Sequence, residues 1–332
     1  MPLDPTRDVP RVADIMHRLQ AADELGEYVD VELCYTSVLH GFWGQINAYR
    51  DAVKFYRNRN GHGRQSSHRL WLKTQHQELY RDLGEFSTVL YSLRSNVAHL
   101  TIIAELFMMI LHVSLDDLQR FAGKLGEDEA RRASATLEES WANGSEARYA
   151  VWHAGQVLNS ARRLAPTSLR RFSAVAVYFA GLTLWTYGLL STATHAASAN
   201  PNLGDHMGEN GGGGQNNNSN NKNNNQAGEG FNQADLVMVD GEETRATRTF
   251  LNLGRGAPGL SHNGDAADGV ASLSDPSMIL TIARGVFRDN FPVRNEPLPP
   301  LVESLENLLR DLASGPAGRP SRAVSEDPHV RE

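Results

Sequence analysis

Apolar residues recur every three or four positions along most of the first 199 residues. This spacing places them on one face of an α-helix. The clearest stripe runs from Ala150 to Leu164. We expect its helix to begin at Ser145, whose side chain suits an N-cap, and to end at Pro166.

The same spacing predicts other helices along the chain. Two of them are long: Tyr28 to Arg57, with kinks expected at Gly41 and Gly44, and Phe86 to Val113. A short helix is opened by Ser114 and Asp117, and a further one runs from Thr167 or Ser168 to Ala197. The last of this group runs from Thr244 to Leu253, with Gly254 as its C-cap. Near the C-terminus, a leucine stripe from Leu301 to Leu312 follows Pro299-Pro300, and two prolines suit a helix start.

Strand patterns are scarce. Only Leu236 to Val239 forms a short apolar run bounded by turn residues, and Gly254 to Gly269 resembles a loop. The chain is therefore predicted to be all-α, an irregular multi-helix bundle interrupted by a Gly/Asn-rich linker.

The composition changes sharply near residue 200. Residues 200–232 hold four consecutive glycines and an asparagine tract with almost no apolar side chains, so we expect a disordered linker. The expected organisation is a main helical domain over residues 1–199, this linker, a C-terminal helical part over residues 233–315 packed on the same domain, and a disordered tail over residues 316–332.

Composition narrows the function classes. The 332 residues include one cysteine, Cys34, which excludes a disulfide framework and any zinc module built on cysteine pairs. A net charge of −7 argues against strong polyanion binding by this chain. These features are typical of a reduced, intracellular globular protein.

One segment admits a membrane interpretation. Phe172 to Leu190 is nineteen residues long, carries no charge and follows Arg170-Arg171. Frequent Ala, Gly, Ser and Thr also suit a helix buried inside a bundle, and we favour that reading, without a membrane. A single-span protein remains an alternative.

Motifs for catalysis are weak. Gly254 to Gly259 fits the dinucleotide pattern G-x-G-x-x-G, but it follows a helix rather than a strand. Asp116-Asp117 is similar to the metal-binding acids of all-α prenyl-chain enzymes, yet Arg120 and the lack of a second acidic motif favour a capping role. The alternative of an all-α enzyme with an apolar substrate pocket therefore lacks a catalytic set.

Histidines and basic residues are spread along the chain. His62, His68 and His76 lie in a basic stretch that could loosely bind a metal, although their spacing does not suit a zinc hydrolase. His153 is expected to be a hydrogen-bonded core residue and Cys34 to be buried and inert. The pairs Arg131-Arg132, Arg162-Arg163 and Arg170-Arg171 are expected on solvated helix faces. No catalytic, cofactor-binding or metal-ligating residue set is predicted.

Four stretches together resemble a family. They are VWHAGQVLNSARRLAP (Val151–Pro166), SLRRFSAVAVYFAGLTLWTYGLL (Ser168–Leu190), DGEETRATRTFLNLGRGAPGL (Asp240–Leu260) and RDNFPVRNEPLPPLVESLENLLRDLASG (Arg288–Gly315). Their order, with a polar linker after the second, is similar to the fungal-specific transcription factor domain, also called the middle homology region, of C2H2 and zinc-cluster regulators.

The resemblance implies a nuclear, non-enzymatic regulatory domain of an RNA polymerase II transcription factor. Its implied partners are proteins of the transcription machinery, with an effector or a second copy of the chain (a homodimer) as further candidates. In the family, zinc and DNA are bound by a separate finger head. One cysteine cannot build that head, so the resemblance implies no cofactor and no sequence-specific DNA binding for this chain.

Overall fold

A computed structural model describes residues 30–58, 65–92, 98–198, 236–264, 269–292 and 297–314. The helices are α3 (Val31–Asn58), α4 (Gln65–Ser92), α5 (Ala98–His112), α6 (Leu115–Phe121), α7 (Glu127–Leu137), α8 (Ser145–Arg162), α9 (Arg171–Ser198), α10 (Arg245–Leu253), α11 (Pro276–Asn290) and α12 (Pro300–Ser314), with a π-helical turn, η1 (Glu138–Ala142). Three short strands are β1 (Leu236–Met238), β2 (Ala257–Ser261) and β3 (Val270–Ser272).

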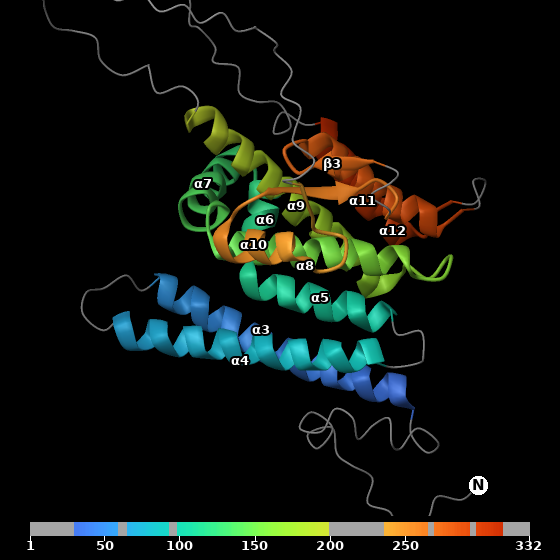
Figure 1. The fold of residues 1–332 in the computed structure, drawn as a ribbon, viewed down its shortest axis with the longest axis horizontal. Coiled ribbons are helices and arrows are strands. Elements are labelled where there is room, and N and C mark those ends of the chain that lie inside the picture. Colours follow the sequence, from blue (N-terminus) through green and yellow to red (C-terminus); the bar gives the residue numbers. More distant parts are fainter. Residues whose placement is uncertain are drawn as a thin grey trace, which may run out of the picture.

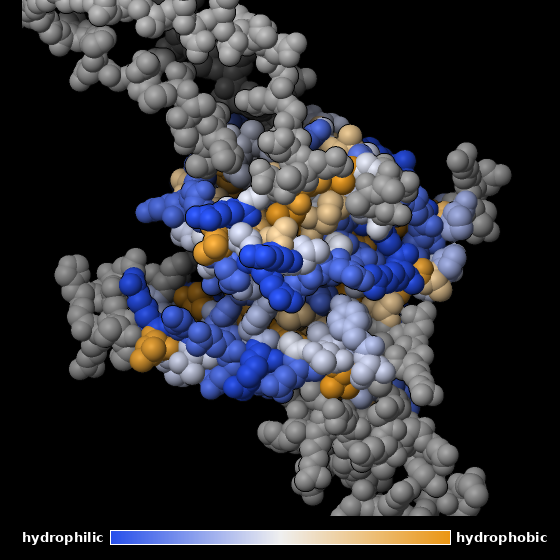
Figure 2. All heavy atoms as spheres, viewed as in Figure 1, coloured by the Kyte–Doolittle hydropathy of each residue, from blue (hydrophilic) through white to orange (hydrophobic). Residues whose placement is uncertain are grey.

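The helices are arranged in layers. Helices α3 and α4 pack side by side, α5 packs on both of them, and α8 covers the other side of α5 (Figure 1). Helix α9 then contacts α5, α6 and α8 as well as α11 and α12. Figure 2 shows mostly hydrophilic residues on the viewed face, with hydrophobic residues reaching it as separate spots. The all-α prediction is confirmed, with a small sheet added.

The long apolar stretch of the chain lies in α9, and this helix is part of the core. Arg171–Thr192 meets the length and hydropathy expected of a membrane span, but 83% of its apolar window is buried inside the molecule. The bent pair α5 and α6 would pass the same test only if taken together. Burial of the α9 side chains, including Trp185 and Leu182, against other helices favours the bundle interpretation.

The long helix predicted from Phe86 to Val113 is wrong. Its apolar stripe belongs to two helices, α4 and α5, which pack against each other. The three- and four-residue spacing continues from one helix into the next, so the sequence pattern contains no signal for the break. Helix α3 continues without a break across Gly41 and Gly44, the two positions where kinks were expected.

Several helix boundaries differ from the prediction. The N-cap of α8 is Gly144 rather than Ser145, and it forms no side-chain capping bond. Helix α9 begins at Arg171, later than Thr167 or Ser168, because those residues form a turn described below. Ser114 caps α6 by accepting a hydrogen bond from the Asp117 amide, as predicted. Gly254 ends α10 with a φ of 68°, which confirms its C-cap role.

The loop predicted from Gly254 to Gly269 is also wrong, because it contains strand β2. This strand pairs in parallel with β1, which confirms the strand predicted near Leu236, and antiparallel with β3. Its sequence, APGLS, has little β-propensity of its own, so the pairing depends on its neighbours. Helices α7 and the first half of α4 were not predicted. The expected linker and the expected tail, residues 200–232 and 316–332, lie outside the described residues.

Glycines allow the C-terminal part to approach α8 and α9 closely. A Cβ at Gly155 in α8 would lie 2.1 Å from the Val239 carbonyl oxygen, and one at Gly188 in α9 would lie 2.2 Å from the Leu273 oxygen. Real Cβ atoms do not approach backbone oxygen so closely, so only glycine fits at these contacts.

A buried charge pair adds to this contact. Asp240, which follows β1, is fully buried and accepts a 2.6 Å bond from Arg162 of α8. It also accepts hydrogen bonds from the backbone N–H and hydroxyl of Ser261 in β2. Arg162 is therefore a structural residue, which corrects the solvated-face expectation for this arginine, whereas Arg163 is exposed as expected.

Helix α12 is attached to α11 through a buried carboxylate. Glu306 accepts hydrogen bonds from Arg284 at 2.7 Å and Arg288 at 2.9 Å, both on α11, and from Arg310 on its own helix. Burial acts to raise the pKa of Glu306, but the three guanidinium groups outweigh it and hold that pKa below its ordinary value.

Gly155→Ala should destabilise the fold by about 1–3 kcal/mol, because a methyl group would collide with the Val239 backbone. Gly44→Ala in α3, where a Cβ meets nothing within 4 Å, is the matched control and should be neutral or stabilising by about 0.5–1 kcal/mol. Urea denaturation measures both. Equal effects of the two substitutions would contradict the close approach.

Glu306→Gln should destabilise the protein by about 2 kcal/mol at pH 7. Because the folded-state pKa is lowered, the carboxylate contributes fully above its ordinary value near 4.5 and loses that contribution as the pH falls through the folded value. The difference between wild type and variant should therefore shrink on acidification. Thermal unfolding from pH 7 to pH 3 checks this, with exposed Glu303→Gln on the same helix as the control.

Candidate functional site

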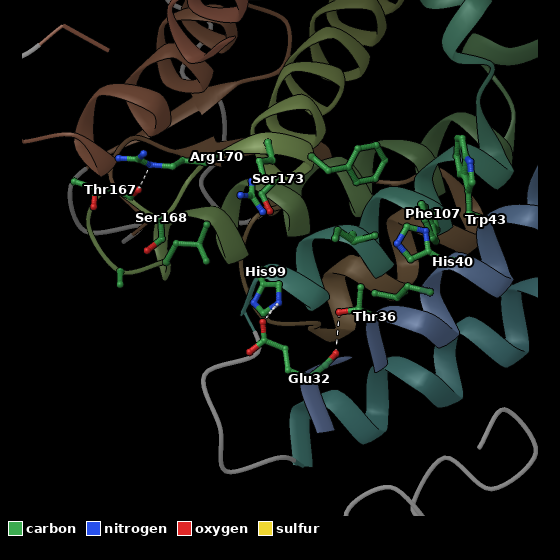
Figure 3. Close-up of a pocket in the computed structure, with 16 residues that line it drawn as sticks. Glu32, Thr36, His40, Trp43, His99, Phe107, Thr167, Ser168, Arg170 and Ser173 are labelled. Carbon is green, nitrogen blue, oxygen red and sulfur yellow. Dashed lines mark hydrogen bonds and ion pairs between the residues drawn. The ribbon is translucent and has the colours of Figure 1, made fainter. Parts of the chain in front are cut away.

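A groove of about 910 Å³ opens between three parts of the fold. One wall is α3, the second is the α5 face with His99, Ile103 and Phe107, and the third is the connection from α8 to α9 with the first residues of α9. Figure 3 shows Trp43, His40 and Phe107 toward one end and Thr167, Ser168 and Arg170 toward the other. This volume lies within the range of about 300–1,000 Å³ typical of small-molecule sites.

One end of the groove is aromatic. Trp43 stacks on Phe107 with ring centroids 5.4 Å apart, and Phe172 meets both rings edge-on at 6.4 Å. The Phe172 side chain is 41% exposed, although it opens the apolar core helix. Phe107 is buried and Trp43 partly buried, so Phe172 is the most exposed ring of the three. Aromatic rings that contact one another at a groove wall provide a surface for a flat apolar group.

The other end is polar and carries Arg170. Arg170 donates a 2.7 Å hydrogen bond to the Thr167 carbonyl and lies over the Phe291 ring. Arg171 lines the groove, and no carboxylate among the described residues pairs with it. Across the groove, Glu32 is engaged by His99 at 3.2 Å. Because no described carboxylate neutralises Arg171, its guanidinium can contact an anion in the groove.

The backbone at this end is strained. Thr167 and Arg171 have φ values of 65° and 52°, in the left-handed region that disfavours residues with a side chain. Such conformations cost of order 1–3 kcal/mol each and cluster at ligand-binding sites. They also explain why α9 begins at Arg171 rather than at Thr167 or Ser168.

Asn290 holds this turn in place from the end of α11. Its side-chain oxygen accepts a 2.8 Å bond from the Leu169 amide, and its side-chain nitrogen donates to the Ala165 carbonyl at 3.0 Å. Its backbone carbonyl accepts a 2.6 Å bond from the Thr167 amide. The C-terminal part of the chain therefore supports one wall of the groove.

A second group of polar side chains lies between α4, α5 and α8. His153 of α8 is buried, and its Nδ1 lies 2.8 Å from a Glu105 oxygen while its Nε2 lies 2.9 Å from the Tyr80 hydroxyl. Both ring nitrogens thus have partners, which confirms the prediction of a hydrogen-bonded core histidine.

Next to it, His112 of α5 and Glu146 of α8 are hydrogen bonded at 2.7 Å through Nδ1, and His76 of α4 lies 3.8 Å from the same carboxylate oxygen. Burial lowers the pKa of His112 to about 4, although the neighbouring Glu146 carboxylate acts to raise it. Burial also lowers the pKa of His76. Burial acts to raise the pKa of Glu146, but His112, His76 and Arg50 outweigh it and lower that pKa.

The three histidines singled out in the sequence are not brought together. His68 is exposed and stacks on Tyr56, His76 joins His112 and Glu146, and His62 lies outside the described residues. Asp116 pairs with Lys54 at 2.6 Å, which lowers the pKa of that carboxyl, and no acidic metal cluster forms around it among the described residues. Cys34 was expected to be buried but is only half-buried, and burial followed by the nearby Asp30 charge raises the pKa of its thiol, which favours the unreactive protonated form.

Other expected residues can be placed as well. Arg131 and Arg132 are exposed and pair with acids three residues earlier, as predicted for a solvated face. The G-x-G-x-x-G segment leads into β2, and no helix follows its last glycine directly, so it cannot present helix amides to a pyrophosphate. The sequence pattern did not single out Trp43, His112 or Glu146, because these residues meet only when separate helices pack.

No protein-family model, curated protein or solved structure matches this chain.

Asn290→Ala should destabilise the protein by about 2–3 kcal/mol, since it leaves the buried Leu169 amide without its acceptor. Asn252→Ala is the matched control, because the exposed Asn252 side chain donates to its own helix and accepts a long 3.4 Å bond from the Tyr149 hydroxyl, with no buried amide depending on it. It should change stability by less than about 0.5 kcal/mol. Chemical denaturation of both variants checks this, and a neutral Asn290→Ala would contradict the supporting role.

Proposed function

We propose that this chain is a regulatory domain of a fungal RNA polymerase II transcription factor and that it binds a small effector in the groove. The four sequence stretches named above support the transcriptional role. Its place of action is then the nucleus, its protein partners belong to the transcription machinery, and DNA contact comes from a separate finger module.

The observation that carries effector binding is the composition of the groove. Arg171 lines the groove and pairs with no carboxylate among the described residues, and the mutually contacting rings of Trp43, Phe107 and Phe172 form one end of it. Arginine recognises carboxylate, sulfonate and phosphate groups through paired N–H donors, whereas the rings favour a flat apolar body. The effector class is therefore an amphipathic anion with an aromatic or other flat apolar part.

In our proposal the groove binds its ligand and does not catalyse a reaction of it. The polar groups on the groove wall are two arginines, several hydroxyls, the imidazoles of His40 and His99, and one carboxylate already engaged by His99. General acid–base or nucleophilic chemistry needs a base placed against a nucleophile, and among the described lining residues no hydrogen bond of that kind is formed.

Anilinonaphthalene sulfonate, a fluorescent aromatic anion, is a suitable probe of the groove. It should bind the full chain saturably at one site, and Arg171→Gln should weaken binding at least about tenfold, because a charge-assisted bond contributes about 1.5–3 kcal/mol. Arg131→Gln, an exposed arginine on α7, is the control and should bind like wild type. A fluorescence titration with no saturation, or equal binding by both variants, would contradict the site.

The transcriptional role has a separate test. The chain fused to an unrelated DNA-binding domain should change the output of a reporter gene that carries the matching site. The Arg171→Gln fusion should alter that response. A fusion that is expressed but leaves transcription unchanged argues against a regulatory domain, whatever the probe titration gives.

A further inference from the structure

His76, His112 and Glu146 form a compact group contributed by three helices. One ring nitrogen of each histidine and one oxygen of Glu146 lie within 4.8 Å of one another. The group lies apart from the groove, where α4 packs against α5 and α8. Trp141 adds a hydrogen bond of 3.0 Å to the His112 carbonyl, which fixes the end of α5 beside it.

The internal hydrogen bonds of this group leave two buried ring nitrogens without a partner. The Nε2 atoms of His76 and His112 are both shielded from solvent, and neither forms a hydrogen bond within the described residues. The His112 side chain is only 4% exposed. Buried polar atoms are nearly always satisfied, so two adjacent unsatisfied nitrogens indicate a missing partner.

The orientation of His76 also suits a ligand. The Leu111 backbone takes part in a hydrogen bond with the His76 ring, while Nε2 forms no hydrogen bond and lies 3.8 Å from a Glu146 oxygen. In metal sites the ligating histidine commonly donates its other N–H to a backbone carbonyl, which fixes the tautomer and the direction of the ring.

We propose that His76, His112 and Glu146 bind one divalent transition-metal ion, for which Zn²⁺ is the probe of choice. Two imidazoles and one carboxylate are a common ligand set for zinc, with metal–ligand distances of about 2.0–2.2 Å. Ligand atoms around a tetrahedral zinc lie about 3.4 Å apart, so separations of up to 4.8 Å within the group must shorten by up to about 1.4 Å. Glu146 is half-exposed at 52%, which leaves it free to move and gives an ion access from solvent.

The site would join the outer α3–α4 layer to the rest of the bundle. Arg50 of α3 is a competing charge, since it acts on both Glu146 and His76. Its repulsion should weaken metal binding, so Arg50→Gln should tighten it. This inference is independent of effector binding in the groove.

The full chain, stripped with a chelator and dialysed, should bind one Zn²⁺ in isothermal titration calorimetry. Glu146→Gln and His76→Asn should each weaken binding by roughly a hundredfold, because losing a direct ligand costs at least as much as losing an outer-shell partner. His68→Asn, an exposed histidine on the same helix, is the matched control and should bind like wild type.

Co²⁺ provides a spectroscopic check, because its visible absorption reports coordination by protein ligands and should be lost in the same two variants. Circular dichroism confirms that each variant is folded, and Glu146, being half-exposed, tolerates substitution best. Absence of Zn²⁺ binding at micromolar concentrations would overturn the proposal. So would unchanged affinity in a folded Glu146→Gln or His76→Asn variant.

Discussion

The contact that the rest of the structure depends on is the close approach of the C-terminal part to α8 and α9. The Val239 and Leu273 carbonyls lie where Gly155 and Gly188 have no side chain, and Asp240 is buried against Arg162. Any larger residue at either glycine would push the backbone outward. These contacts set the position of the sheet, and with it the position of α11.

The position of α11 then determines the groove. Asn290, the last residue of α11, accepts and donates the hydrogen bonds that hold the turn from Ala165 to Leu169. That turn carries the strained Thr167 and leads into Arg171, the cation we propose as the anion contact. A segment more than 100 residues away in sequence thus shapes one wall of the groove, and a ligand held there would act on both parts of the chain.

Local pattern was sufficient for the elements that are amphipathic and well capped. The α8 stripe, the α12 leucines, the Ser114 cap and the Gly254 C-cap all follow from residues within one or two turns of each other. Prediction from the sequence failed where contacts between distant segments determine the secondary structure. Strand β2 exists because β1 and β3 pair with it, and the break between α4 and α5 interrupts a stripe whose spacing continues. The candidate sites are still harder to predict from the sequence, because side chains such as His76, His112 and Glu146 come from three different helices.

The central claim is that the C-terminal part holds the wall of the groove in its strained conformation. Amide hydrogen exchange, followed by NMR on the full chain, tests it most directly at Thr167 and Leu169, whose N–H groups donate to Asn290. Our account predicts that both amides are protected to about the same extent as those in the middle of α11, since they open only when the two parts separate. Exchange of either amide at the rate of an unprotected loop would contradict it.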